Sequence, residues 1–164
     1  MRFAVCGLGT QRERKLEKCE GIEPSAKRVR ALIDRETNEG LELSRIVVAG
    51  FSQGGAMSLY TGLQLDARAP LAGVVCMSGY LPNSDTFQPS ACALKTPVLM
   101  CHGELDPMVR LSWAEDAKTV LTSRGIGVEW HSFPDLEHSA HMEELEVVRS
   151  WIAGRLPEAQ GGGE

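Results

Sequence analysis

The chain has 164 residues, of which 43% are apolar and 24% charged, and its formal net charge is −5. These values suit one globular domain and imply no particular partner. The sequence has no Lys/Arg stripe interleaved with aromatic residues, which disfavours nucleic-acid binding, and no apolar run near the ~20 residues of a membrane-spanning helix. Its five cysteines lack C-x-x-C spacing, which argues against a disulfide framework or a zinc ribbon and favours a reducing, cytoplasmic setting.

Strands and helices are predicted to alternate from about residue 21 onward. We leave 1–20 unassigned, expect one catalytic core over 21–157, and interpret 158–164 as a disordered tail. Helical apolar spacing is found at Ile22, Ala26, Val29 and Ile33, at Ala56, Leu59, Tyr60 and Leu63, at Trp113, Ala117, Val120 and Leu121, and at Met142, Leu145, Val148, Ile152 and Leu156. Strands are predicted at 45–50, 73–78, 97–101 and 128–133.

This alternation is typical of an α/β fold with a mostly parallel sheet flanked by helices. The first three strands are short, apolar and rich in β-branched residues, so we expect each to be buried on both faces. The fourth strand alternates polar and apolar residues. Nothing in the sequence suggests a linker that would divide the fold into two domains.

The segment Gly50-Phe51-Ser52-Gln53-Gly54 matches G-x-S-x-G between a strand and a helix. A nucleophile on such a sharp turn needs strained backbone angles, and the flanking glycines remove side chains that would clash. The amino terminus of the following helix also offers partial positive charge to an oxyanion. The motif therefore predicts Ser52 as a nucleophile, although a plain glycine-rich turn gives the same pattern.

A serine nucleophile needs a base, and the base needs an orienting carboxylate. In the α/β order of Ser, acid and His, Asp106 follows the third strand at its carboxyl end, with Glu104 as the rival acid. His138 lies in a loop before the last helix and is the preferred base, with His141 as the alternative. His102 precedes the acid, and His131 lies within a strand. The His138-x-x-His141 pair lacks a third ligand, so no metal is predicted.

Several motifs, in this order, are similar to those of the acyl-protein thioesterase family of phospholipase/carboxylesterase-like α/β hydrolases. The resemblance covers about residues 21–157. It rests on Gly21-Ile22 leading into Ala31-Leu32-Ile33-Asp34, on Phe51-Ser52-Gln53-Gly54-Gly55-Ala56-Met57-Ser58-Leu59-Tyr60, on His102-Gly103-x-x-Asp106-Pro107, and on His138-Ser139 with Glu143-Glu144-Leu145.

The resemblance implies an α/β-hydrolase fold that lacks the family's N-terminal part. It implies a catalytic triad of Ser52, Asp106 and His138, with the backbone N–H of Gln53 as one oxyanion donor and, more weakly, Leu8 in Gly7-Leu8-Gly9 as the second. It implies no cofactor, and substrates that are S-acylated proteins, lysophospholipids or simple carboxylic esters, with at most transient contact with a membrane surface.

A second hypothesis is a catalytically incompetent fragment, or a non-enzymatic interaction protein, of the same fold. Because the strands expected before 45–50 and the second oxyanion donor are not evident, we expect low solubility and weak esterase activity from this chain. Cys101 is predicted to be a small core residue rather than a second nucleophile.

Overall fold

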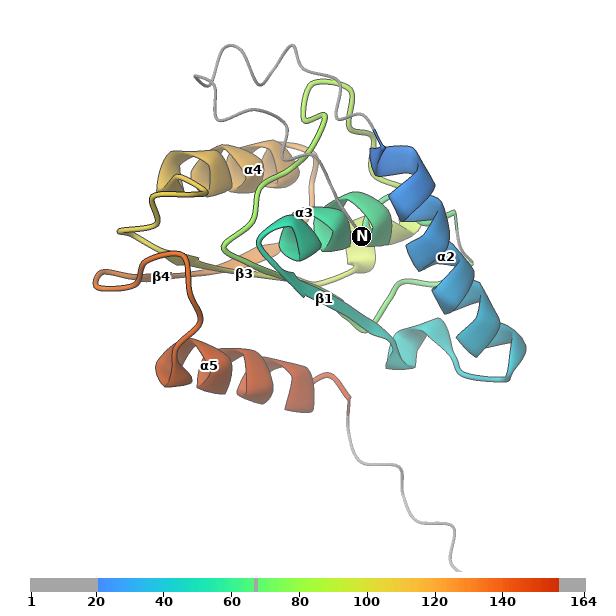
Figure 1. Ribbon diagram of the computed structural model, residues 1–164. Helices are drawn as coiled ribbons and strands as arrows, with labels where there is room; N and C mark the ends of the chain where they lie inside the picture. The colour runs from blue at the N-terminus through green and yellow to red at the C-terminus, as the bar shows by residue number, and fades with distance from the viewer. Residues whose placement is uncertain (1–20, 67, 157–164) are drawn as a thin grey trace, which may run out of the picture.

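The computed structural model describes residues 21–66 and 68–156, which form a parallel sheet between two layers of helices (Figure 1). The described sheet has the order β1-β2-β3-β4, and every neighbouring pair is parallel. Its strands are β1 (Val47–Phe51), β2 (Gly73–Met77), β3 (Val98–Gly103) and β4 (Val128–Phe133).

Helices cover the two faces of this sheet unequally. Figure 1 shows α2, α3 and α4 above the sheet and α5 below it. Their bounds are α2 (Ile22–Asn38), α3 (Gln53–Gly62), α4 (Leu111–Ser123) and α5 (Met142–Ala153), with short 3₁₀ turns η1 (Leu43–Arg45) and η2 (Ala91–Lys95). The α/β architecture predicted from the sequence is confirmed.

The hydrophobic core is divided by the sheet into two clusters. The larger one joins the inner faces of α2, α3 and α4 to one side of the strands, with Leu59, Leu63, Val74 and Met100 almost completely buried. The smaller one packs α5, through Val148 and Trp151, against the other side of β2 and β3. Burial of these apolar side chains is the main stabilising contribution to the sheet.

The strand register places the functional loops together. Phe51 pairs with Met77, Met77 with Cys101, and Gly103 with Phe133. Because the strands are parallel, their carboxyl ends lie at one edge, where α/β proteins collect functional groups. Segments starting at Ser52, Glu104 and Pro134 all leave from this edge.

Strand β1 differs from its prediction. It runs from Val47 to Phe51 rather than 45–50, and Ala49 in its centre is exposed. Two-sided burial was predicted, but within the described residues β1 has one neighbouring strand, and α5 lies under β3 instead. Burial on both faces holds for β3, all of whose residues are buried.

The other elements keep their predicted places with small shifts. β3 ends at Gly103 rather than at 101, β2 ends at Met77, and α5 ends at Ala153, before the predicted end at Leu156. β4 has the predicted bounds.

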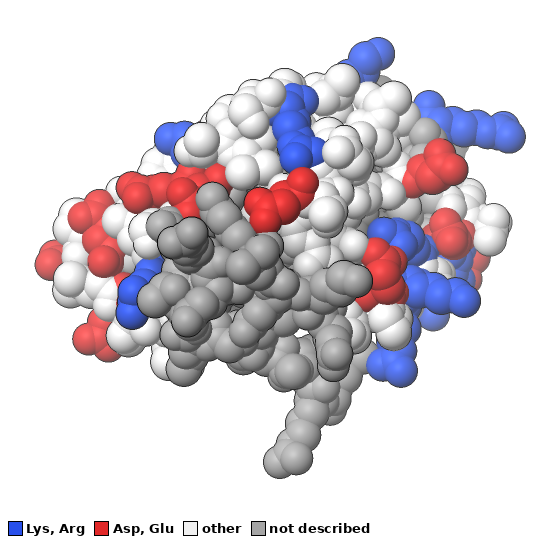
Figure 2. All heavy atoms as spheres, turned by 90° about the horizontal axis from the view of Figure 1, so that it is seen from above, with Lys and Arg blue, Asp and Glu red and all other residues white. Residues whose placement is uncertain are grey.

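Figure 2 shows acidic and basic side chains interspersed over the described part of the upper face. Among the described residues, no helix combines the length and apolar character needed to cross a membrane.

Candidate active site

Ser52 occupies the tight turn between β1 and α3. Its backbone has φ 56° and ψ −121°, in the region that side-chain-bearing residues rarely adopt. Such a conformation costs about 1–3 kcal/mol and persists only where the surroundings impose it. Here the Ser52 N–H donates to the Met77 carbonyl at 2.8 Å, and the Ala56 N–H donates to the Ser52 carbonyl at 3.0 Å. The turn is therefore fixed from the neighbouring strand and from the first turn of α3.

The glycines of this turn have unequal roles. A Cβ on Gly50 would lie 2.2 Å from the Gly54 carbonyl carbon, so only glycine fits at that position. A Cβ on Gly54 itself would meet nothing within 4 Å. The expectation that both glycines of the motif prevent a side-chain clash is thus wrong for Gly54: its backbone is what approaches Gly50, while its own Cβ direction is open. The space around Gly55 is smaller, since a Cβ on this residue would lie 3.0 Å from Cys76 Sγ.

Asp106 lies in the loop that follows β3, and its side chain is completely buried. One carboxylate oxygen, Oδ1, accepts two backbone hydrogen bonds, from the Met108 N–H at 2.9 Å and the Val109 N–H at 2.8 Å. An aspartate that binds the amides two and three residues ahead stabilises a local turn. The second oxygen, Oδ2, is left to face His138.

His138 lies in the loop between β4 and α5, and this loop passes very close to the end of β3. A Cβ on Gly103 would lie 2.2 Å from the Leu136 carbonyl oxygen, so glycine at this position lets the histidine loop come near. The Phe51 ring packs against the imidazole with 4.9 Å between ring centroids. Phe51 and Gly103 thus orient His138 from β1 and β3.

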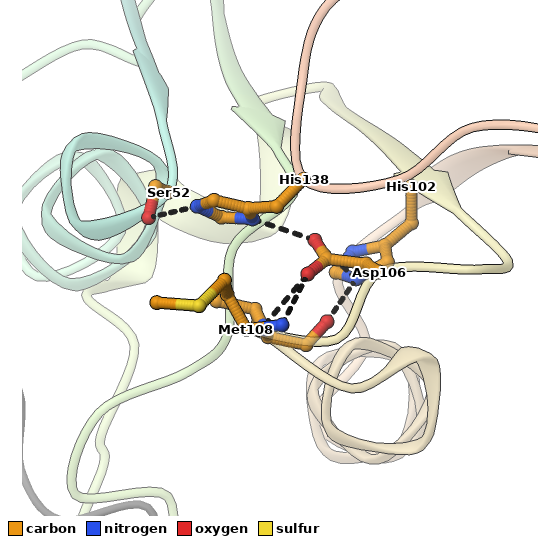
Figure 3. Close-up of polar contacts among 6 residues, drawn as sticks. Ser52, His102, Asp106, Met108 and His138 are labelled. Carbon is orange, nitrogen blue, oxygen red and sulfur yellow. Dashed lines mark hydrogen bonds and ion pairs between the residues drawn. The ribbon is translucent and has the colours of Figure 1, made fainter.

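These three residues form one hydrogen-bonded row (Figure 3). His138 Nε2 is 2.9 Å from Ser52 Oγ, and His138 Nδ1 is 2.7 Å from Asp106 Oδ2. Because an ionised carboxylate only accepts hydrogen bonds, Nδ1 carries the proton in the neutral ring and Nε2 is free to accept the serine proton. This is the geometry required of a nucleophile, a base and the group that orients the base.

A model of the phospholipase/carboxylesterase family matches residues 7–155. The chain belongs to this family. It is 39% identical to acyl-protein thioesterase 1 of Gibberella zeae over 86% of this chain and 61% of that protein. It is 33% identical to lysophospholipase-like protein 1 of Mus musculus over 86% of this chain and 59% of that one.

Solved structures agree with the fold. SOBER1 of Arabidopsis thaliana is 32% identical with a TM-score of 0.76, covering 85% of this chain and 66% of that one. Acyl-protein thioesterase 2 of Zea mays is 26% identical with a TM-score of 0.70, covering 84% of this chain and 65% of that one. The chain spans about three-fifths of the length of the curated relatives that it matches.

The other acidic and histidine residues considered as the catalytic acid or base of this phospholipase/carboxylesterase family chain do not lie in the row with Ser52. Glu104 accepts a hydrogen bond from Ser132 Oγ at 2.7 Å, and His131 pairs with Glu129 at 3.2 Å. His141 is the N-cap of α5 rather than a helical residue, and its Nδ1 accepts from the Glu144 N–H at 3.2 Å. Each has a local partner away from Ser52.

Of the two predicted oxyanion donors, one lies within the described residues. Gln53 is the first residue of α3, where backbone N–H groups lack partners within the helix. Leu8 lies outside the described residues.

Two features of the site had not been identified from the sequence. The backbone amides of Met108 and Val109 hold Asp106, and the Asp-Pro turn is a signal that could have suggested this. His102 is almost fully buried beneath the acid loop, with Nε2 2.8 Å from the Val109 carbonyl oxygen. The sequence order excluded His102 as a base and gave no reason to consider another role.

Burial controls the other titratable groups near the site. It lowers the pKa of His102, and it raises the pKa of the Cys101 thiol to about 12, so this thiol stays protonated. Cys101 is 1% exposed, which confirms its prediction as a core residue. Within 21–66 and 68–156, no group of three His, Cys, Asp or Glu residues is placed to hold a metal ion.

Proposed function

We propose that this chain is a serine hydrolase that cleaves acyl thioesters or carboxylic esters through a covalent acyl-enzyme. The observation that carries the proposal is the row from Ser52 Oγ through His138 to Asp106, with separations of 2.9 Å and 2.7 Å. Triads of this geometry are found in acyl-transfer enzymes on several unrelated folds.

In the first half of the reaction, Ser52 Oγ attacks the acyl carbon while His138 Nε2 takes the hydroxyl proton. The negative charge that develops on the acyl oxygen is stabilised by the backbone N–H of Gln53 and the amino terminus of α3. His138 then gives its proton to the departing thiolate or alkoxide. Asp106 keeps the imidazole in the productive tautomer and stabilises its charged form.

In the second half, water replaces the leaving group. His138 removes a proton from the water as it attacks the acyl-Ser52 ester, and returns that proton to Ser52 Oγ as the carboxylic acid is released. The proposed partners are acylated proteins, lysophospholipids or simple esters, in keeping with relatives named acyl-protein thioesterase 1 and lysophospholipase-like protein 1. No metal or cofactor enters either step.

Labelling with a fluorophosphonate probe tests this proposal, because the probe reacts covalently with an activated serine. We expect the purified chain to label, Ser52→Ala to abolish labelling, and Ser58→Ala to label as the unmodified chain does. Ser58 is a matched control because its buried hydroxyl already donates to the Gly54 carbonyl at 2.9 Å. An unlabelled parent chain would favour the incompetent fragment, and labelling that persists in Ser52→Ala would contradict the assignment.

A further inference from the structure

The acid loop rests on a buried histidine that the mechanism above does not use. His102 is the fifth residue of β3, is 1% exposed, and stacks on Trp130 of β4 with ring planes 10° apart and centroids 6.5 Å apart. Its side chain therefore has one fixed orientation, in which the ring edge faces the residues that follow Asp106 (Figure 3).

The hydrogen bond of His102 determines its tautomer. Nε2 is 2.8 Å from the Val109 carbonyl oxygen, and a carbonyl oxygen only accepts, so Nε2 carries the proton and donates. Burial lowers the pKa of His102, outweighing the Val109 hydrogen bond and the nearby Asp106 and Glu115 carboxylates, which favour the charged form. His138 acts in the same direction as burial, and the Lys118 ammonium lies over the Trp130 ring. His102 is consequently a neutral donor at physiological pH.

Val109 connects this donor to the acid. Its carbonyl oxygen accepts from His102, while its N–H donates to Asp106 Oδ1 at 2.8 Å. Both backbone polar groups of one residue are thus held, which fixes the direction of the N–H toward the carboxylate. His102 Nε2 is 3.7 Å from Asp106 Oδ2, beyond direct hydrogen bonding, so its effect on Asp106 runs through Val109.

We propose that His102 is a positioning residue that orients Asp106 toward His138 by holding the Val109 backbone from beneath. The inference rests on the proposed function, because it needs Asp106 to act on His138. Without the His102 donor, Val109 can turn its N–H away from Oδ1, and the carboxylate loses one of the two amides that aim Oδ2 at His138 Nδ1. The imidazolium form of His138 is then stabilised less.

The test is the pH dependence of the second-order rate of fluorophosphonate labelling at Ser52. His102→Phe keeps the ring stacked on Trp130 but removes the donor, whereas His102→Gln keeps an N–H donor of similar reach. The control is Met100→Ala, which removes a buried core side chain from the same face of β3 and takes away none of the hydrogen bonds that hold Asp106.

We expect His102→Phe to label about 10- to 100-fold more slowly, the size of effect that small misplacement of a catalytic group produces. The labelling rate of His102→Phe falls off at low pH, where His138 becomes protonated, and this acid limb of the pH profile should lie about half a unit or more lower than in the parent chain. The reason is that the His138 imidazolium is less stabilised in the variant. His102→Gln should recover most of the rate and the position of the limb. Met100→Ala should lower the thermal midpoint and leave the limb in place.

Two outcomes would overturn the inference while leaving the proposed function intact: a His102→Phe chain that labels like its parent, or one that is slower with an unmoved acid limb. A parent chain that does not label at Ser52 would instead refute the proposed function. If His102→Phe does not fold, ¹⁵N NMR of the parent chain decides. A neutral His102 protonated at Nε2 is expected at pH 7 to 8, and the Nδ1–H tautomer or an imidazolium in that range would contradict the proposal.

Discussion

The turn that carries Ser52 and the loop that carries Asp106 lie at the same edge of the sheet, but they are held in place by different means. The Ser52 turn is shaped by backbone strain and by the absence of a side chain on Gly50, whose Cβ would lie 2.2 Å from Gly54. The Asp106 loop is shaped by hydrogen bonds from Met108 and Val109, supported by His102. A position that only glycine fits can be recognised as a motif in the sequence. A hydrogen bond from a backbone N–H can come from almost any residue type, so it is much harder to recognise there.

The largest expected effects come from the two residues that join these regions. His138→Ala and Asp106→Asn should each lower the rate of fluorophosphonate labelling by about 10³-fold or more, because triad members act as a unit. The double variant should be hardly slower than His138→Ala alone. Rates measured at one pH for the three variants check this, and independent, multiplying losses would contradict a joint role.

The glycine pair sharpens the comparison within the Ser52 turn. Gly50→Ala should prevent correct formation of the turn and abolish labelling, since its Cβ would overlap the Gly54 backbone. Gly54→Ala should label within about threefold of the parent chain and be slightly more stable, because Ala is the better helix former and its Cβ would meet no neighbour in the first turn of α3. Labelling and thermal midpoints of both variants measure the contrast, and equal damage from the two would show that Gly54 is needed for another reason.

Glu144 and its neighbour Glu143, both at the start of α5, should differ in how they affect the stability of the fold as pH changes. Glu144 is fully buried, and neither of its carboxylate oxygens has a hydrogen-bond partner among the residues that the structure describes. Burial raises the pKa of this carboxyl, and His141 opposes the shift. Below the unfolded-state pKa both states are protonated, and stability is unaffected. As pH rises above it, the unfolded chain ionises more readily, so the carboxyl increasingly destabilises the fold.

Glu144→Gln should therefore raise the thermal midpoint at pH 8 by about 2–4 °C for each kcal/mol gained, and change it little at pH 4. Glu143→Gln is the control, because the Glu143 side chain is 78% exposed. Thermal unfolding of both variants at the two pH values checks the sign. A Glu144→Gln chain that is less stable at pH 8 would mean that the ionised carboxylate has a favourable partner.

The smallest effect is expected at Cys101, next to the acid loop. Cys101→Ala should change the labelling rate by less than about twofold, because the raised pKa of this buried thiol, about 12, makes it inert. Iodoacetamide at pH 8 should modify the half-buried Cys92 before Cys101, as read by peptide mass spectrometry. Prompt alkylation of Cys101 would show that the region opens more readily than its burial implies.

Much of the fold followed from periodicity alone. The strand at 128–133 was placed to the residue, and the helical stripe of Ala56, Leu59, Tyr60 and Leu63 is buried as expected. The exposure of Ala49 was not predictable, because an apolar run has the same pattern whether or not both of its faces are covered. Tertiary arrangement, rather than composition, decides that difference.

The candidate site was predictable to a similar degree. The structure brings together Ser52, Asp106 and His138, which were selected by a glycine motif and by chain order. The open space at Gly54 and the support of Val109 by His102 were missed. Both depend on how segments pack in three dimensions: the space around a Cβ at Gly54, and the approach of the His102 ring to the Val109 carbonyl. The amino-acid sequence pattern alone does not encode either.

The most direct test of the central claim is to trap the acyl-enzyme. The chain is mixed with excess p-nitrophenyl acetate, quenched in acid during the first turnover, digested and mapped by mass spectrometry. We expect a p-nitrophenol burst of about one per active chain and a single acetyl group on the peptide that contains Ser52, with both absent in Ser52→Ala. An acetyl group on a cysteine or histidine instead, or an undiminished burst in Ser52→Ala, would contradict the account.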